Sequence, residues 1–535
     1  MEKRNRNSFG IQRVYFITII ILLMMLLVQR FYSDKQMPIP RGEWDKLYLV
    51  LDQIEKNYVD DVDAKEIVEK SLPFILEELD PHSVYLPPME LQRADEALEG
   101  SFDGIGITFN VPNDTAVVST VISGGPSERA GLLSGDRLVE VNGVTVAGVK
   151  MNQDSIVKHL RGPRGSKVTI QVQRLGLSDL IPVSIIRDKI AEKSVDVSYM
   201  LDNQIGYIKL SKFTRTSYEE ALRALGELTK QGMTKLIFDL RDNSGGYMEP
   251  ALRIANEFLD KGQLIMYQEG ANRPRQDYFA KTQGLASGIP LAVLINEASA
   301  SSSEILAGAL QDNDRAVIVG RRSYGKGLVQ EPIYFSDRSG MRLTVGRYFT
   351  PTGRCLQRPY DNGRDSYRYD IWERYRHGEL THADSIPKID SLKYQTPKGK
   401  IVYGGGGIIP DLFVPIDTTA NDFLWQAERR GMMFRFSSQF ADNHRAEIRE
   451  IKEMNALNNL FGRVDLGKAF LAYAAGQGLT PKPGEWEAGN VRILNLIEAY
   501  IGRSTPMEDQ AFYQIIGKLD RELRVAAGEL RADKI

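Results

Sequence analysis

The chain has 535 residues, of which 42% are hydrophobic and 26% are charged, a composition typical of folded globular protein with several domains. Lysine and arginine number 68 against 70 for aspartate and glutamate, so there is no basic excess to drive general binding to nucleic acid. The single cysteine, Cys355, excludes intramolecular disulfides and cysteine-ligated metal sites, and the histidines form no HExxH motif, so we expect no metal and no cofactor.

An apolar run follows a basic N-terminus. Residues 14–28 contain one polar side chain, Thr18, and four lysine or arginine residues precede them. A cleaved signal peptide would require small residues after the run, and the sequence QRFYSDKQMPIP offers no such site. We therefore expect residues 1–33 to form a cytoplasmic stub and an uncleaved single-pass anchor, although the run is short for a span. The positive-inside bias then places the rest of the chain on the extracytoplasmic, periplasmic side of the cell membrane.

Residues 43–87 predict an N-terminal helical segment. Apolar residues recur at spacings of three and four up to Leu79, and prolines then break the pattern. The periodicity becomes strand-like further on. Runs rich in β-branched residues at 117–121, 137–141 and 168–173 are separated by glycine-rich turns, which indicates a β domain between residues 88 and 186.

One stretch of this β region, GPSERAGLLSGDRLVEVNG at 125–143, resembles PDZ domains of the kind associated with bacterial proteases. The resemblance implies that residues 88–186 capture protein C-termini by strand addition, with the amides of one loop holding the carboxylate. Glycines in such a loop let amides converge on an anion, or they only relieve crowding at a strand turn. The expected tail-binding residues are Gly104, Ile105, Gly106 and Ile107.

Between residues 190 and 350, predicted strands alternate with predicted helices, which indicates an α/β layer structure. Residues 361–400 are polar and charged, and we expect them to form an inserted loop or mobile excursion. Residues 417–535 have mostly helical periodicity. The expected fold is an α/β multidomain chain with an α/β core at 187–416 and a helical C-terminal extension at 417–535.

A candidate nucleophile stands at a predicted strand-to-helix turn. Residues 296–312 read NEASASSSEILAGALQD, and a helix begins near Ser301. A hydroxyl at a helix N-terminus lies beside unpaired amides and the positive end of the dipole, which suits a reaction that forms an oxyanion. Ser301-x-x-Glu304 is also a capping box, and the pattern alone favours this structural interpretation.

Residues 43–416 as a whole resemble the C-terminal processing peptidases, also called tail-specific proteases. The family's motifs occur in order: LDPHSVYL at 79–86, the PDZ segment, FDLRDNSGG at 238–246, NEASASSSEILAGALQD at 296–312, SYGKGLVQ at 323–330, YFTPTGR at 348–354 and GIIPD at 407–411. The resemblance implies a crotonase-like protease core with an inserted PDZ domain. It also implies a serine endopeptidase that uses a Ser–Lys dyad on proteins or peptides with accessible C-termini.

The resemblance assigns Ser301 as nucleophile, with Ser299 and Ser303 as alternatives, and Lys326 as general base. A serine needs such a base, and burial would lower the lysine pKa from ~10.4 to roughly 7–8, where the amine accepts a proton. Gln330 matches the position proposed to orient the lysine. On a straight strand these two residues would lie about 13 Å apart at ~3.3 Å per residue, so the chain must curve for them to meet.

The oxyanion hole is expected to combine the amide of Ser302, which stands where the family usually has alanine, with Gly245 or Gly246. The LDPHSVYL motif at 79–86 contains His82, which suggests a Ser-His-Asp triad as an alternative, with Asp239 or Asp242 as the acid. In the family this histidine precedes the PDZ segment and is not the base, so we expect it to be structural.

Three functions compete at this point. The first is a membrane-anchored endopeptidase that captures C-terminal tails, and the second is a catalytically silent PDZ binding or scaffold protein of the cell envelope. The third is a crotonase-type acyl-CoA enzyme. Intact Ser301, Lys326 and Gln330 disfavour the second, while the PDZ segment and the extracytoplasmic location disfavour the third. Residues 417–535 are a candidate surface for binding a second copy of the chain or an adaptor protein. We expect no binding to nucleic acid.

Overall fold

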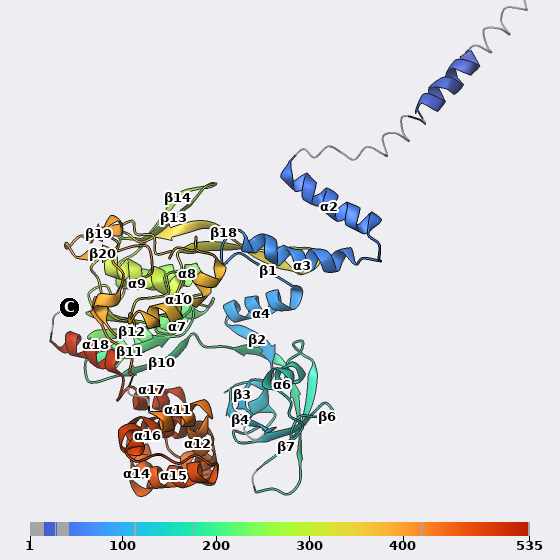
Figure 1. Cartoon of the computed structure of the whole chain (residues 1–535). Coiled ribbons are helices and arrows are strands. Elements are labelled where there is room, and N and C mark those ends of the chain that lie inside the picture. The colour runs from blue at the N-terminus through green and yellow to red at the C-terminus, as the bar shows by residue number, and fades with distance from the viewer. Residues whose placement is uncertain are drawn as a thin grey trace, which may run out of the picture. The chain divides into compact units, whose positions relative to one another are not determined.

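The computed structural model describes residues 15–26, 28, 42–111, 114–122, 124–174, 176–418 and 421–532 (Figure 1). They form two compact units, one ending at Ile75 and one beginning at Leu76. The first unit contains a helix at 15–26, α2 (Glu43–Asn57) and most of α3 (Ala64–Glu77). Residues 1–14, 27 and 29–33 of the predicted anchor lie outside the described residues. Among the helices that are described, none has the length and apolarity needed to cross a membrane.

The segment with the PDZ motif folds into a six-stranded antiparallel sheet in the order β3-β4-β5-β7-β8, with β6 paired to β5. In β7 the buried Val168, Ile170 and Val172 alternate with more exposed residues, as expected for a strand with one face on a core. The predicted strands at 117–121, 137–141 and 168–173 are confirmed. The elements are β3 (Ile107–Asn110), β4 (Ala116–Val121), α5 (Pro126–Arg129), β5 (Arg137–Val141), β6 (Val144–Thr145), α6 (Gln153–Leu160), β7 (Lys167–Gln173) and β8 (Ile181–Ile186).

Two shorter elements flank this sheet in the chain. Helix α4 (Pro88–Glu99) begins at a proline, whose fixed φ fits the first turn of a helix, and ends at Gly100 with a φ of 69°. Strand β2 (Ser101–Gly104) then pairs with β9 (Asp188–Ala191), so the chain enters and leaves the PDZ region through one antiparallel pair.

A second six-stranded sheet, in the order β10-β11-β12-β15-β16-β21, forms the centre of the α/β region. Only the β10–β11 pair is antiparallel. Every residue of β11 and β15 is buried, because helices cover both faces of the sheet. The strands are β10 (Val195–Met200), β11 (Ile205–Leu210), β12 (Lys235–Asp239), β15 (Leu291–Ile295), β16 (Val317–Gly320) and β21 (Leu412–Phe413).

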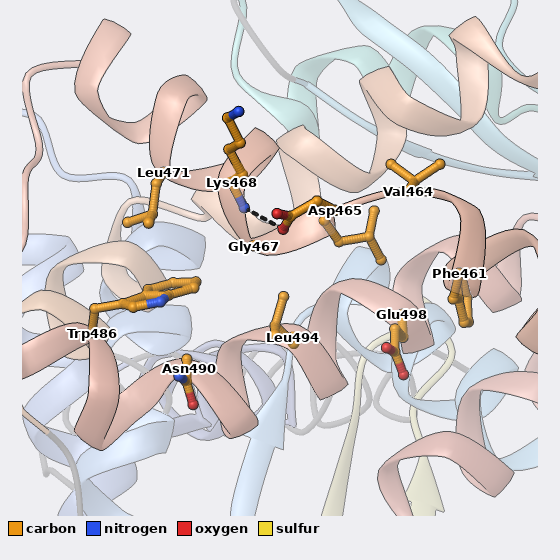
Figure 2. Close-up of a pocket in the computed structure, with 11 residues that line it drawn as sticks. Phe461, Val464, Asp465, Gly467, Lys468, Leu471, Trp486, Asn490, Leu494 and Glu498 are labelled. Atoms are coloured by element: carbon orange, nitrogen blue, oxygen red, sulfur yellow. Dashed lines mark hydrogen bonds between the residues drawn. The ribbon is translucent and has the colours of Figure 1, made fainter.

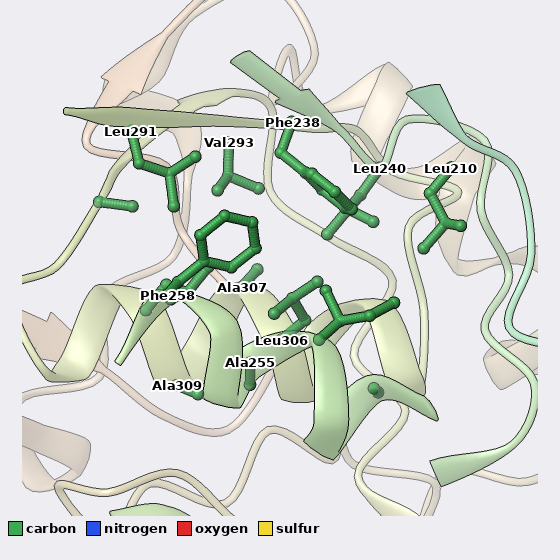
Figure 3. Packing of buried hydrophobic residues seen from close by; sticks show 14 of the residues in the cluster. Leu210, Phe238, Leu240, Ala255, Phe258, Leu291, Val293, Leu306, Ala307 and Ala309 are labelled. Atoms are coloured by element: carbon green, nitrogen blue, oxygen red, sulfur yellow. The ribbon is translucent and has the colours of Figure 1, made fainter. Parts of the chain in front are cut away.

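Helices α7 (Ser217–Lys230), α8 (Met248–Phe258) and α9 (Ser302–Asp312) pack on one face of this sheet. Figure 3 shows Phe238 and Val293 pointing from the strands toward Phe258 of α8. Helix α18 (Arg521–Arg531) packs on the other face. Since α9 follows β15 directly, this core fixes the position and direction of the turn that contains Ser301.

A five-stranded antiparallel sheet contains the segment that follows Lys326. Strand β18 (Gly340–Phe349) pairs with β1 (Val84–Leu86), β13 (Leu264–Gly270) and β17 (Leu328–Tyr334), and β13 also pairs with β14 (Arg273–Phe279). Strand β1 follows His82 closely. The sheet therefore brings the LDPHS motif and the lysine motif to one place, although they are far apart in the sequence.

The prediction of a loop or mobile excursion at 361–400 is wrong. The segment contains α10 (Arg364–Arg376), two short helices, η2 (Ala383–Ser385) and η3 (Asp390–Leu392), and β19 (Lys393–Gln395), which pairs with β20 (Ile401–Tyr403). Helix α10 packs through polar groups: the buried Arg374 donates to Glu379, which also accepts from the buried Arg322. Periodicity of apolar residues cannot reveal a helix that is held by buried ion pairs.

The predicted helical C-terminal region is confirmed. It has its own hydrophobic core, which includes Phe423, Leu457, Phe470 and Ile497. The last helix of the chain, α18, does not join this core and packs against the six-stranded α/β sheet. The other helices are α11 (Asp422–Arg429), α12 (Met432–Asn443), α13 (Arg445–Ile448), α14 (Met454–Arg463), α15 (Leu466–Gly476), α16 (Glu485–Arg503) and α17 (Asp509–Ile516).

Candidate active site

Ser301 occupies the N-cap of α9 in a strained backbone conformation, with φ 55° and ψ −114°. A positive φ is uncommon for a residue with a side chain, and such strain is typical of functional turns. The side chain is partly exposed. The turn thus places a hydroxyl at the start of a helix whose other first-turn residues are buried.

The neighbouring hydroxyls are used inside the protein. Ser299 donates to the carbonyl of Leu240 at 2.8 Å, and Ser303 donates to the carbonyl of Asn243 at 2.8 Å. Both serines are fully buried. Their hydroxyls join the nucleophile turn to the turn after β12, which favours Ser301 over these two alternatives.

Glu304 connects the serine turn to the lysine loop. One of its carboxylate oxygens accepts from the amides of Ser301 and Lys326, at 2.9 and 2.8 Å. The other accepts from the hydroxyl of Ser323 and the amide of Gly325, at 2.6 and 2.7 Å. Burial raises the pKa of this carboxyl, although all four donors favour its ionised form. The predicted capping residue therefore also holds the two catalytic candidates together.

Lys326 lies in the loop before β17, and its Nζ donates to Oε1 of Gln330 at 2.9 Å. A β-bulge between Val329 and Gln330 supplies the curvature that a straight strand lacks. Burial lowers the pKa of Lys326, and the nearby Arg342 guanidinium lowers it further. An amine in this setting is a better proton acceptor than an exposed lysine.

His82 contributes its backbone to this arrangement. Its carbonyl accepts from Nε2 of Gln330 at 2.5 Å, and its ring nitrogen Nε2 lies 2.8 Å from the hydroxyl of Tyr367 in α10. Burial lowers the pKa of His82 to about 4, so the ring is neutral near pH 7. The two candidate acids have other partners, since Asp239 pairs with Arg241 and Asp242 bonds Asn296.

The glycine turn after β12 touches the serine turn. A Cβ built on Gly245 would lie 2.8 Å from Cβ of Ser301 and 3.0 Å from the amide nitrogen of Ser302. Gly245 has a φ of 100° and Gly246 a φ of 144°. The Gly245 amide donates to Oδ1 of Asn243 at 2.9 Å. A glycine is required here for close approach, and the turn lies directly against the amide of Ser302.

Sequence reasoning missed two contributors to this site. Tyr348 bonds the carbonyl of Lys326 and lies 3.1 Å from the carbonyl of Ser301, and Tyr367 supports His82. Tyr348 stands in the YFTPTGR motif, which marked the segment without indicating a role. Tyr367 lies in the segment that was expected to be a loop.

The predicted tail-binding residues run from Gly104, the last residue of β2, to Ile107, the first residue of β3. Gly106 has a φ of 75°, and a Cβ there would lie 3.1 Å from the side chain of Ile190. The Ile105 side chain is buried, and its carbonyl accepts from the amide of Ser127 in α5 at 3.0 Å. Strand β3 starts at Ile107 and is the terminal strand of its sheet among the described residues. The loop thus ends at a strand edge, as PDZ recognition requires.

Two cavities lie away from Ser301 and Lys326. One, of about 850 Å³, is lined by residues that include Met89 of α4, Phe102 of β2 and Tyr334 of β17. The other, of about 540 Å³, lies between α14, α15 and α16, where Trp486 and Leu494 face Leu471 (Figure 2). Neither is lined by Ser301 or Lys326. In the part of the chain that the structure describes, His, Cys, Asp and Glu side chains form no metal-binding group.

Comparison with known proteins gives a consistent picture. Residues 204–361 match peptidase family S41, and residues 117–174 match the PDZ domain family. The carboxy-terminal-processing protease of Bartonella bacilliformis is 33% identical over 312 residues, which cover 58% of this chain and 71% of that protein. The carboxy-terminal processing protease CtpA of Bacillus subtilis is 33% identical over 318 residues, which cover 59% and 67%. A solved photosystem II D1 C-terminal processing protease is 26% identical, with a TM-score of 0.37, and the match covers 71% of this chain and 95% of that one.

Proposed function

This chain is a serine-type endopeptidase of peptidase family S41, the carboxy-terminal processing proteases, and we propose that it cleaves peptide bonds with Ser301 as nucleophile and Lys326 as general base. The observation that supports this most directly is the setting of Lys326. Its amine is largely buried, its pKa is lowered, and its backbone is tied through Glu304 to that of Ser301.

In the proposed reaction, the neutral Nζ of Lys326 takes the proton of the Ser301 hydroxyl as Oγ bonds to the scissile carbonyl carbon. The carbonyl oxygen becomes an oxyanion beside the amide of Ser302 and the Gly245–Gly246 turn. The lysine ammonium then gives its proton to the departing amine as the C–N bond breaks. Water, deprotonated by the same lysine, attacks the acyl-enzyme. The lysine ammonium then returns that proton to Oγ of Ser301 as the acyl C–O bond breaks and the new carboxyl terminus is released.

We expect kcat/KM to rise with pH through the lowered pKa of Lys326 and to level off above it. The sign follows from the role of a base, because only the deprotonated amine accepts the serine proton. His82→Ala keeps the backbone carbonyl that holds Gln330 and should retain this rise. A rise with pH that disappears in His82→Ala would instead indicate histidine catalysis. Initial rates on a fluorogenic peptide between pH 5 and 10 measure the profile.

We also propose that the loop of Gly104, Ile105, Gly106 and Ile107 binds the C-terminal carboxylate of the substrate, and that the tail pairs with the free edge of β3. A peptide with a C-terminal amide should then bind about ten- to a hundredfold more weakly than the free acid, because charge-assisted hydrogen bonds are lost. Fluorescence anisotropy of the two labelled peptides measures the difference. Equal affinity would show that the loop does not read tails.

A glycine pair gives this test a matched control. Gly106→Ala forces a side chain into a left-handed conformation and against Ile190, so it should weaken binding of the acid. Gly148→Ala imposes the same kind of strain at a φ of 73° with open space around it. If both variants bind the free-acid peptide with the same reduced affinity, the loss in Gly106→Ala comes from general backbone strain in the domain and not from the tail-binding loop.

We propose that residues 1–33 anchor the enzyme in the cell membrane, with the catalytic part on the periplasmic side. The basic flank, the apolar run and the lack of a small-residue cleavage site in the sequence support this topology. Protease digestion of spheroplasts tests the orientation, and N-terminal sequencing of the mature protein tests whether the anchor is retained.

A further inference from the structure

Besides its backbone amide, Ser302 has a hydroxyl that is hydrogen-bonded to a neighbouring turn. Its Oγ donates to the carbonyl of Gly246 at 2.9 Å and lies 3.2 Å from the carbonyl of Tyr247. Ser302 is only 1% exposed. A buried hydroxyl at the first position of α9 is therefore bonded to the turn that follows β12.

The same turn is held from its other side by β-type contacts. The amide of Tyr247 donates to the carbonyl of Phe213 at 2.8 Å, and the amide of Phe213 donates to the carbonyl of Gly245 at 3.0 Å. A Cβ on Gly246 would lie 2.0 Å from the carbonyl oxygen of Phe213. The glycine turn thus lies between a rigid neighbour and the Ser302 hydroxyl.

We propose that the Ser302 hydroxyl is a positioning group of the oxyanion hole. The donors of the hole come from two separate segments, the start of α9 and the glycine turn, and they must converge on one oxygen atom to stabilise it. Ser302 contributes its amide to one side and bonds the other side through its hydroxyl, so it links the two groups of donors directly. This inference rests on the proposed catalytic role of Ser301 and of these amides.

The chain itself points to this role. Ser299 and Ser303, on either side of the proposed nucleophile, bond the carbonyls of Leu240 and Asn243 in the turn after β12. Ser302 extends the same set of bonds to Gly246, in the glycine turn that is expected to form the other side of the oxyanion hole.

The test compares Ser302→Ala, Ser302→Cys and Ser437→Ala in the full chain. Ser437 is a matched control, because it is also 1% exposed and donates to a backbone carbonyl, that of Ile497, at 3.1 Å in the C-terminal helices. Ser302→Ala should lower kcat about three- to tenfold with KM changed less than twofold, as expected for one lost hydrogen bond. Ser302→Cys should be intermediate, because a thiol is a weaker donor. Ser437→Ala should retain full activity at a similar loss of Tm.

A second readout separates positioning from general stability. A peptide aldehyde forms a hemiacetal with the nucleophile and places an oxyanion in the hole, whereas the matching peptide alcohol does not. Ser302→Ala should lower the affinity for the aldehyde by the same factor as it lowers kcat, and should leave the affinity for the alcohol unchanged. Equal weakening of both inhibitors, or kcat and aldehyde affinity within twofold of wild type, would overturn the proposal.

Ser301→Ala is assayed in parallel. If it is inactive while Ser302→Ala behaves as wild type, only the positioning role of Ser302 is rejected. If Ser301→Ala still cleaves, the proposed nucleophile is rejected and the role of Ser302 is rejected with it.

Discussion

Ser301→Ala and Lys326→Ala should each lower kcat about 10⁴-fold or more, and the double variant should lose no more than either single variant. Residues that act as one unit show such non-additive losses, because removing either leaves the other without a function. The fold should survive Ser301→Ala, since the change costs at most about 1 kcal/mol at a helix start. Rates on an unfolded tagged protein substrate, with circular dichroism of each variant, measure both effects.

Lys230→Ala is the control for the lysine change, because Lys230 is an exposed residue at the end of α7. Losses that multiply in the double variant would mean that the serine and the lysine act in separate steps. Full activity of Ser301→Ala would redirect the search to Ser299 and Ser303. A wild-type chain that binds tails and cleaves nothing would support the silent scaffold function.

Glu304→Ala should reduce the free energy of unfolding by about 3–5 kcal/mol and also abolish cleavage. The change leaves four buried donors without their acceptor, and each such donor costs about 1–3 kcal/mol before relaxation. Cleavage is lost because the same carboxylate holds the backbones of Ser301 and Lys326. Urea unfolding and peptidase rates at a temperature where the variant is folded separate the two effects.

Glu304→Gln and Glu257→Gln make this test sharper. Glu257 of α8 is also buried, and its carboxylate accepts from the hydroxyl of Tyr218 at 2.8 Å. Both amide variants should lose stability, because an amide places donors where an acceptor stood. Only Glu304→Gln should lose kcat out of proportion to stability. Equal kcat for the two variants would show that Glu304 supports the fold and not the alignment of the site.

The sequence was sufficient for features that depend on local patterns. Runs of β-branched residues between glycine-rich turns located the strands of the PDZ region, and small residues after LAVLI located the turn of Ser301. It was not sufficient for long-range polar contacts. The capping motif identified Glu304, but nothing local shows that its carboxylate also accepts from Gly325 and Lys326.

The error at 361–400 has the same origin. A charged segment without an apolar stripe is usually read as a loop, yet the guanidinium of Arg374 is buried and bonded to Glu379 and to the carbonyls of Arg322 and Ser323. Such a helix is stable only in its tertiary setting. Its partners at 322–323 are some fifty residues away, so no window of sequence contains the signal.

The bond between His82 and Tyr367 joins residues 285 positions apart in the chain. Contacts of such sequence separation form late in folding, because the long intervening loop must first be closed. The carbonyl of the same histidine holds Gln330 against Lys326. A nascent chain therefore has an incomplete base until α10 has emerged and docked. Delayed assembly of this kind would keep the peptidase inactive during its own synthesis.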